Sequence, residues 1–387
     1  MALKYMLGFD LYPGNVDAGG YIVNGAGIEK THYAPDFRVV STAVASTPTL
    51  NNQIGVSGQA AHKMSPGSVY ERNAFVIKRM GNQNTNAYLR NITPLTAPAE
   101  GGMVCTAFTY KVLPGINTSN NEVPLFSIYS GAAGAALVML KIRSSTTDTA
   151  IQLSFFNNPA IPVTKYPYLV AGREYHIEVR MIRRVGAPSG TYDFQLRIDG
   201  DLIDSAAITD TRFNTSGICF FYGVNILNAQ VNIASLYSDI IIADSNAGIF
   251  DKGIGPQLIL PSKMASVTPG AWEKEGNATA TDTLTDFNDT TYYASPVDAG
   301  AMSVKVAGVN TPYKTLASEV VIRASRDRDA GRILTAEMRN ADGSASLTPP
   351  SNIATANGYN PYLLARLEGI AEADIRTPTV RLNATVP

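Results

Sequence analysis

The stretch YDFQLRIDGDLID, residues 192–204, alternates apolar and polar side chains and then breaks at a glycine. Apolar residues stand at every second position from Tyr192 to Ile198, which is the period of a strand buried on one face. The strand ends at Asp199-Gly200, a dipeptide favoured in tight hairpins because glycine accepts a positive φ without a steric clash. Leu202 then begins a return strand. The stretch therefore predicts a β-hairpin.

The acids of this stretch raise a second interpretation, which is a calcium site. Asp193, Asp199, Asp201 and Asp204 surround Gly200. A calcium loop of the helix-loop-helix kind needs oxygen ligands at several alternate positions and a closing glutamate, and the residues after Gly200 supply none in register. The hairpin is the better interpretation, and neither a metal ion nor any other cofactor is predicted.

The same period of two recurs along the chain and predicts an all-β protein. In the strand expected from Tyr175 to Arg183, Ile177 falls on the face toward the core, whereas His176 and Glu178 fall on the polar face and are expected in solvent. Turns rich in glycine, proline and asparagine separate the periodic runs. Further strands are expected at residues 108–112, 137–142, 151–155, 231–237, 304–306, 320–325 and 333–338.

Helical patterns are scarce in this sequence. The best window is YLLARLEGIAE, residues 362–372, which is short and is interrupted by Gly369. Composition changes between Asp244 and Pro256, where no apolar period survives and glycines are frequent. A domain boundary is expected there, with domains at residues 1–246 and 256–387 and an accessible link between them.

Charge and hydropathy exclude several classes of partner. The formal net charge is −1, from 31 basic and 32 acidic residues, and no run of lysine or arginine suits a phosphate backbone. No window reaches the roughly 20 apolar residues of a membrane span, and the first residues lack the apolar core of a signal peptide. We therefore expect no nucleic acid partner, no membrane insertion and synthesis in a cytoplasm. Cys105 and Cys219 lie in apolar runs and are expected to be buried free thiols.

The strands between Cys105 and Ala243 contain the runs EYHIEVRMIRR, YDFQLRIDGDLIDS, ICFFYGV and VNIASLYSDIIIAD. Their order resembles that of concanavalin A-like (laminin G-like) jelly-roll sandwiches. The opening MALKYMLGFDLY is similar to the start of bacteriophage virion proteins that carry such a domain. The resemblance implies a jelly-roll domain over residues 1–246.

The second part of the chain carries its own resemblance. The run GAWEKEGNATATDTLTDFNDTTYYASPVDAG and the later EVVIRASRDRDAGRILTAEMRN resemble a β-sandwich module of phage tail and virion structural proteins. Together the resemblances cover most of the chain. They imply a phage virion structural protein that is associated with the tail, baseplate or fibre, lies in the virion, and assembles with copies of itself and with other virion proteins. Two alternatives stay open: a lectin-like module that binds host glycans, and a capsid decoration protein.

Catalytic signatures are missing from the places where jelly-roll enzymes carry them. Concanavalin-like glucanases place Glu-x-Asp-x-Glu on one strand, so that alternation turns the carboxylates into one cleft. The nearest acid pairs here, Glu372/Asp374 and Asp327/Asp329, lack the third residue and lie in the second domain. The sequence therefore predicts that the protein is not an enzyme.

Aromatic residues are the candidates for ligand contact. Lectin-like sandwiches bind sugars by stacking them on exposed rings, whereas aromatics in a sheet that is covered on both sides are core or subunit interface. Phe220 and Tyr222 share one face of their strand, and Phe221 takes the other. The candidates for a glycan contact or an interface are Tyr166, Tyr168, Phe221 and Trp272.

Overall fold

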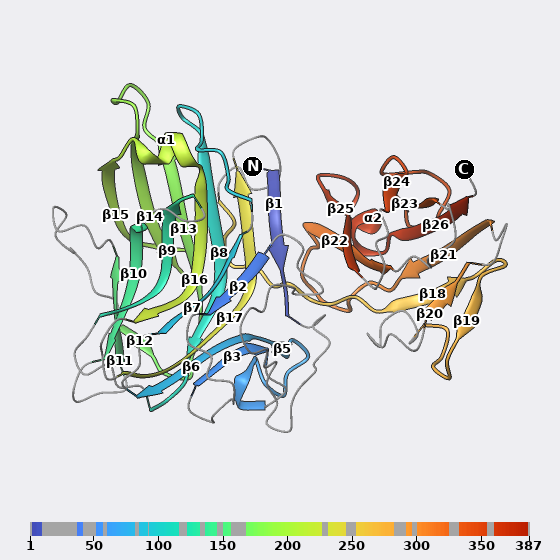
Figure 1. The fold of residues 1–387 in the computed structure, drawn as a ribbon, viewed down its shortest axis with the longest axis horizontal. Helices are drawn as coiled ribbons and strands as arrows, with labels where there is room; N and C mark the ends of the chain where they lie inside the picture. Colours follow the sequence, from blue (N-terminus) through green and yellow to red (C-terminus); the bar gives the residue numbers. More distant parts are fainter. Residues whose placement is uncertain are drawn as a thin grey trace. The chain divides into compact units, whose positions relative to one another are not determined.

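The computed structural model divides the chain into two compact units, Met1–Ile259 and Leu260–Pro387 (Figure 1). The structure describes residues 2–9, 37–41, 52–56, 60–81, 85–91, 93–115, 122–131, 136–144, 150–155, 168–226, 231–244, 253–281, 292–295, 300–324, 333–353 and 360–385.

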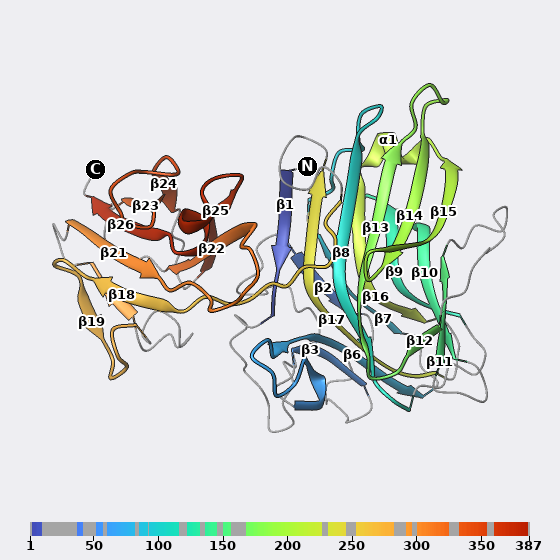
Figure 2. The same cartoon turned by 180° about the vertical axis from the view of Figure 1, so that it is seen from behind.

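The large unit is a sandwich of two antiparallel sheets, which both views of the ribbon show as layers (Figures 1 and 2). The eight-stranded sheet runs in the order β15 (Asp201–Thr209), β14 (Thr191–Ile198), β13 (Glu174–Arg183), β8 (Met103–Val112), β17 (Val231–Asp244), β6 (Phe75–Gly81) and β3 (Asn52–Val56), and β1 (Ala2–Leu7) pairs with β17. The seven-stranded sheet runs in the order β12 (Tyr168–Val170), β11 (Ala150–Phe155), β10 (Ala136–Ser144), β9 (Val123–Ser130), β16 (Ile218–Ile226), β7 (Thr85–Asn91) and β2 (Phe37–Ser41).

Alternation along the strands builds the core between these sheets. Ile177 of β13 lies opposite Phe108 of β8 and Ile198 of β14, and all three side chains are buried. The ring of Phe108 also packs against Phe126 and Tyr222 of the facing sheet, with centroids 5.5 and 5.4 Å apart. Each such side chain contributes about 1.5–3 kcal/mol through burial, so the sandwich is held mainly by these inward faces. The predicted placement of Ile177 in the core is confirmed.

The hairpin predicted at residues 199–200 joins β14 to β15. Asp199 has φ 52° and Gly200 has φ 92°, so both central residues of the turn adopt the left-handed conformations that a tight hairpin requires. Asp199 also makes contacts of its own: its Oδ1 accepts the His176 N–H at 2.9 Å, and its Oδ2 lies 3.4 Å from Arg173 Nη2. The turn interpretation of the acidic stretch is therefore confirmed.

Smaller elements complete the large unit. They are the 3₁₀ turn η1 (Ala60–His62), the short strands β4 (Lys63–Met64) and β5 (Arg72–Asn73), and the helix α1 (Arg212–Ser216). Cys105 and Cys219 are buried free thiols, as predicted, and burial raises the pKa of each thiol. No helix within the described residues is long and apolar enough to cross a membrane.

The small unit is a second, smaller β-sandwich. Its main sheet runs in the order β18 (Met264–Thr268), β21 (Gly300–Val306), β26 (Thr379–Thr385), β23 (Ile333–Arg339) and β24 (Ser351–Ile353). Two further pairs are β22 (Ala317–Ala324) with β25 (Asn360–Glu368), and β19 (Glu273–Glu275) with β20 (Tyr292–Ala294). Its core contains Trp272 packed with Met302, Val304 and Val380.

The window with the best helical pattern, residues 362–372, is mostly strand, in keeping with the all-β prediction. Residues up to Glu368 form β25, and the helix α2 spans Glu372–Arg376. Leu367 lies opposite Ser318 of β22 and is buried in the core of the small unit. Cross-strand pairing and burial therefore override the local helical preference, and Gly369, at φ 69°, ends the strand rather than interrupting a helix.

Candidate functional site

Polar side chains gather on the outward face of the eight-stranded sheet, which is the face turned away from the sandwich core. The adjacent strands β13, β8 and β17 bring them together, because His176 pairs with Thr109 and Glu174 pairs with Lys111 across β13 and β8. Asp239 follows Ser238 in an irregularity of β17 opposite β8, and its φ is 52°. All of these side chains except the half-buried Glu174 are buried, so another part of the chain covers the face.

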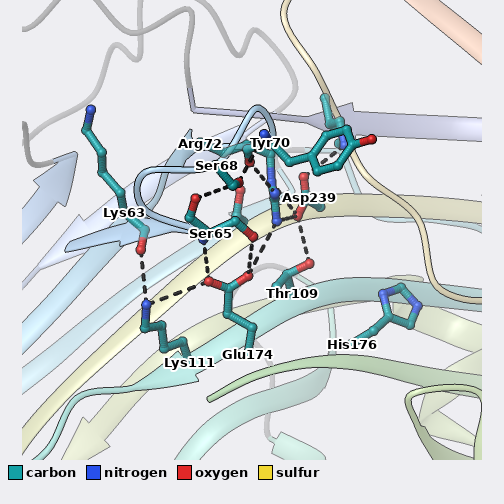
Figure 3. A network of polar contacts seen from close by, with 12 residues as sticks. Lys63, Ser65, Ser68, Tyr70, Arg72, Thr109, Lys111, Glu174, His176 and Asp239 are labelled. Atoms are coloured by element: carbon teal, nitrogen blue, oxygen red, sulfur yellow. Dashed lines mark hydrogen bonds and ion pairs between the residues drawn. The ribbon is translucent and has the colours of Figure 1, made fainter. Parts of the chain in front are cut away.

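Asp239 is the centre of this network. Its side chain is fully buried, and its Oδ2 accepts hydrogen bonds from Arg72 Nε and Nη2 at 3.1 and 2.9 Å and from Thr109 Oγ1 at 2.7 Å. Figure 3 shows the guanidinium of Arg72 and the hydroxyl of Thr109 converging on this carboxylate. Burial raises the pKa of Asp239, while Arg72 and the hydrogen bonds act in the opposite direction. The ion pair with Arg72 offsets the desolvation cost of burying a charged Asp239 carboxylate.

Glu174 ties the short β4–β5 segment to the same face. Its carboxylate accepts a hydrogen bond from the Ser65 backbone N–H, and its Oε2 accepts one from Ser65 Oγ at 3.0 Å. Lys111 Nζ lies 3.6 Å from Glu174 Oε1 and donates to the Lys63 carbonyl at 3.2 Å (Figure 3). These contacts fix the Lys63–Ser65 end of the segment to the face.

Residues 253–259 cover the other part of the face, and we call this segment the strap. Glu178 of β13 is 1% exposed, and its Oε1 and Oε2 accept the backbone N–H groups of Ile254 and Gly255 at 2.8 and 3.3 Å. Arg180 binds the same carboxylate through Nε and Nη2 at 2.8 and 3.1 Å. At the other end of the strap, the Ile259 N–H donates to Asp239 Oδ1 at 2.8 Å. The prediction that Glu178 is solvated is therefore wrong, because a segment distant in sequence lies over it.

His176 is buried under the same cover, so the prediction that it lies in solvent is also wrong. The residue is 8% exposed, and neither Nδ1 nor Nε2 has a hydrogen-bond partner. Burial lowers the pKa of His176 to about 4, while the carboxylates of Glu178 and Asp199 and the backbone of Gly255 oppose this shift in part. The imidazole is therefore neutral at physiological pH. In Figure 3 it stands apart from the ion pairs around Asp239, with no contact drawn to it.

The covered polar face is a set of charged groups held in place by ion pairs and hydrogen bonds. Within the part of the chain that the structure describes, no group of three or more His, Cys, Asp or Glu side chains is placed to hold a metal ion. Sequence reasoning missed Arg72 and Asp239 altogether. The available signal was Asp239 in the middle of the run SLYSDIIIA of β17, because an acid among core residues needs a buried partner.

The second candidate lies on the outward face of the seven-stranded sheet. Phe221 of β16 stacks on Tyr129 of β9, with ring centroids 4.0 Å apart, and packs against Tyr88 of β7 at 4.7 Å. The guanidinium of Arg90 lies 5.9 Å from the Phe221 centroid. Phe221 is only 5% exposed, while Tyr88, Tyr129 and Arg90 around it are half-buried. We call these four residues the aromatic cluster.

The remaining predicted aromatics lie in different places. Tyr168 is 59% exposed on the edge strand β12. Trp272 is buried in the core of the small unit, where its Nε1–H donates to the Gly300 carbonyl at 3.2 Å. Tyr166 lies outside the described residues. The structure thus groups Phe221 with Tyr88 and Tyr129, which sequence reasoning did not select because their alignment depends on the register of three strands.

Comparison with known proteins bears on the fold. Neither a protein-family model nor a curated protein matches the sequence. Among solved structures, the alginate lyase PA1167 from Pseudomonas aeruginosa is 13% identical, with a TM-score of 0.32 and coverage of 51% of this chain and 87% of that chain. An endo-1,3-beta-glucanase from Streptomyces sioyaensis is 11% identical, with a TM-score of 0.38 and coverage of 62% and 96% respectively. These proteins share the concanavalin A-like jelly roll that the sequence predicted, and at such identities the likeness extends no further than the fold.

The prediction that the protein is not an enzyme is wrong as an inference from this fold. The structures similar to the chain are alginate lyases and a glucanase, which are enzymes. The absence of Glu-x-Asp-x-Glu excludes one arrangement of catalytic carboxylates and says nothing of other arrangements on the same scaffold.

Proposed function

We propose that the large unit binds carbohydrate, and that it does so through the aromatic cluster on the seven-stranded sheet. One observation carries this proposal: Tyr88, Phe221 and Tyr129 face outward side by side on three neighbouring strands, with Arg90 over the central ring. Aromatic rings on the outer face of a sheet expose apolar surface to water, which is unfavourable unless a ligand or another part of a protein covers them.

The chemistry of the cluster suits a sugar. The apolar face of a pyranose stacks on an aromatic ring, while an arginine donates hydrogen bonds to hydroxyl or carboxylate oxygens. Phe221 packs between Tyr88 and Tyr129, and these contacts restrict its rotamer. The two tyrosine rings therefore pack against a fixed side chain. A pre-ordered platform of this kind loses little side-chain entropy on binding.

The experiment is a glycan array probed with the full chain, followed by titration of the best sugar. Tyr129→Ala should weaken binding about tenfold or more, which is about 1.4 kcal/mol. The matched control is Tyr313→Ala, which removes an exposed tyrosine of the small unit. A chain that binds no sugar, or a Tyr129→Ala variant that binds as well as the parent, would rule out this proposal.

A virion role is the second candidate, and the resemblance of MALKYMLGFDLY and of the second-unit runs to phage virion proteins favours it. On this reading the chain is a tail, baseplate, fibre or capsid decoration component, and it contacts copies of itself and other virion proteins. Both proposals are compatible, because a virion surface protein is well placed to meet host glycans. Electron micrographs of phage particles labelled with an antibody to this chain test the location, and unlabelled particles contradict it.

A further inference from the structure

The strap is held through its backbone rather than through polar side chains. The N–H groups of Ile254 and Gly255 reach Glu178 at 2.8 and 3.3 Å, and the N–H of Ile259 reaches Asp239 at 2.8 Å. Gly253 and Gly255 have φ of 100° and 66°, so these contacts recognise a bend of the main chain that favours glycine at both positions, rather than an extended strand. A peptide with glycine at these two positions could adopt the same bend and satisfy both carboxylates.

Both acceptors are fixed by partners that do not belong to the strap. Glu178 is held by two hydrogen bonds from Arg180, at 2.8 and 3.1 Å. Asp239 is held by Arg72 and by Thr109, the latter at 2.7 Å. The carboxylates would therefore keep their positions after the strap had left, so the face is pre-organised for an occupant.

The strap also contributes one anchoring side chain. Ile254 is buried, whereas Leu258 of the same segment is 40% exposed. Main-chain hydrogen bonds combined with a buried side chain are a usual means by which a protein binds a peptide.

His176 gives an independent indication that this face is meant for a ligand. It is more than nine-tenths buried, and although the backbone of Gly255 lies near the ring, neither ring nitrogen makes a hydrogen bond of good geometry. Unpaired polar groups at this depth are uncommon and costly, and a donor or acceptor from a better-fitting occupant would satisfy them.

We propose that the face formed by His176, Glu178, Arg180 and Asp239 is a binding site for a glycine-containing peptide, and that the strap is its resident occupant in cis. The site lies on the eight-stranded sheet and is distinct from the aromatic cluster. A tethered segment acts at an effective concentration on the order of millimolar, so a free peptide competes only after the strap has been released. The structure therefore describes the closed state of this site.

The test uses the full chain and a fluorescent peptide with the sequence GIGPQLIL, residues 253–260. Ile254→Asp places a charge at the buried anchor, beside Glu178, and should release the strap while leaving the acceptors intact. Leu258→Asp is the matched control, because it makes the same change at an exposed position of the same segment. The peptide should bind the Ile254→Asp chain at least tenfold more tightly than the parent or the Leu258→Asp chain. Adding Glu178→Gln to the Ile254→Asp chain should abolish this binding.

Hydrogen exchange supplies the second readout. The amides of Gly255 and Ile259 should exchange at least tenfold faster in Ile254→Asp than in the parent, and sugar binding should be unchanged. The proposal would be overturned if these amides stayed protected in Ile254→Asp. It would also be overturned if they exchanged faster but the peptide did not bind, or if an oligosaccharide bound there in place of the peptide. If Ile254→Asp does not fold, Ile254→Thr provides the same comparison, since it keeps the β-branch but shortens the side chain and places a hydroxyl group at the buried anchor.

Discussion

Asp239 and Arg72 form an ion pair that water does not reach. Their side chains are 0% and 1% exposed, and the guanidinium lies 2.9 Å from the carboxylate. Removing one member of such a pair leaves the other charged and buried, which costs more than the pair contributes. Loss of Arg72 or Asp239 is therefore expected to destabilise the fold mainly because the remaining partner stays charged and buried, and less because the contact itself is lost.

Arg72→Met tests this argument. The variant should lower the free energy of unfolding by about 3–5 kcal/mol, because Asp239 loses its only charged partner among the contacts that the structure describes. Urea titration followed by tyrosine circular dichroism measures the change. Arg212→Met is the control, since Arg212 pairs with Asp210 on the surface. It should leave the unfolding free energy unchanged within experimental error, and equal losses in the two variants would contradict the buried-pair account.

His176 makes stability depend on pH. Its pKa falls from 6.5 to about 4 on folding, so the unfolded chain binds the proton more readily. Its contribution to stability is complete above pH 6.5 and is lost as the pH falls toward 4, by roughly 3 kcal/mol in all. We expect His176→Gln to lose less stability than the parent between pH 7.5 and pH 4. His62, whose pKa burial also lowers, titrates in both chains and cancels in the comparison. Parallel pH profiles would contradict the assignment to His176.

Strand β13 is buried on both faces, unlike an ordinary strand of a two-layer sandwich. Its inward face meets the core through Ile177, and its outward face meets the strap through Glu178. We expect Ile177→Asp to cost about 3–5 kcal/mol and Glu178→Lys to cost a similar amount, because each places an unmatched charge in a buried site. Ser205→Lys, on the edge strand β15, should change stability by less than about 0.5 kcal/mol. If Glu178→Lys left the free energy of unfolding unchanged, the strap would not cover β13.

Local pattern predicted the strands but not what covers them. The period of two located β13 and β14 and the turn at Asp199-Gly200, because alternation and turn chemistry are properties of neighbouring residues. The burial of His176 and Glu178 depends on residues 253–259, which lie far along the chain and carry no periodic signal. For the same reason the sequence could place Phe221 on an outward face but could not align it with Tyr129.

The two units each have a core of their own, and Trp272, the single tryptophan, belongs to the small unit. Tryptophan fluorescence therefore reports the small unit alone. Ile177→Asp should move the tyrosine circular dichroism transition to lower urea and leave the fluorescence midpoint in place. Val304→Asp, in the core of the small unit, should do the reverse. Transitions that move together in both variants would show that the units unfold as one.

Independent folding of residues 1–246 and 256–387 stays a prediction. Contacts of the strap with Glu178 and Asp239 suggest a longer first fragment, residues 1–259, because the shorter fragment lacks the cover of the polar face. The longer fragment should therefore melt at a higher temperature than residues 1–246, and calorimetry of the two fragments measures the difference. Equal melting temperatures would mean that the strap adds nothing to the stability of this unit.

Strand β1 lies beside the far end of β17, with Leu7 opposite Ile240 and Ala2 opposite Asp244. During translation the ribosome releases β1 long before its partner exists. At about 5–20 residues per second, synthesis from residue 7 to residue 240 takes roughly 10 to 50 s. Throughout that interval the apolar run ALKYML has no native sheet to join and is open to chaperones or to premature association. The fold therefore requires β1 to pair late, after most of the other strands of the large unit have been synthesised.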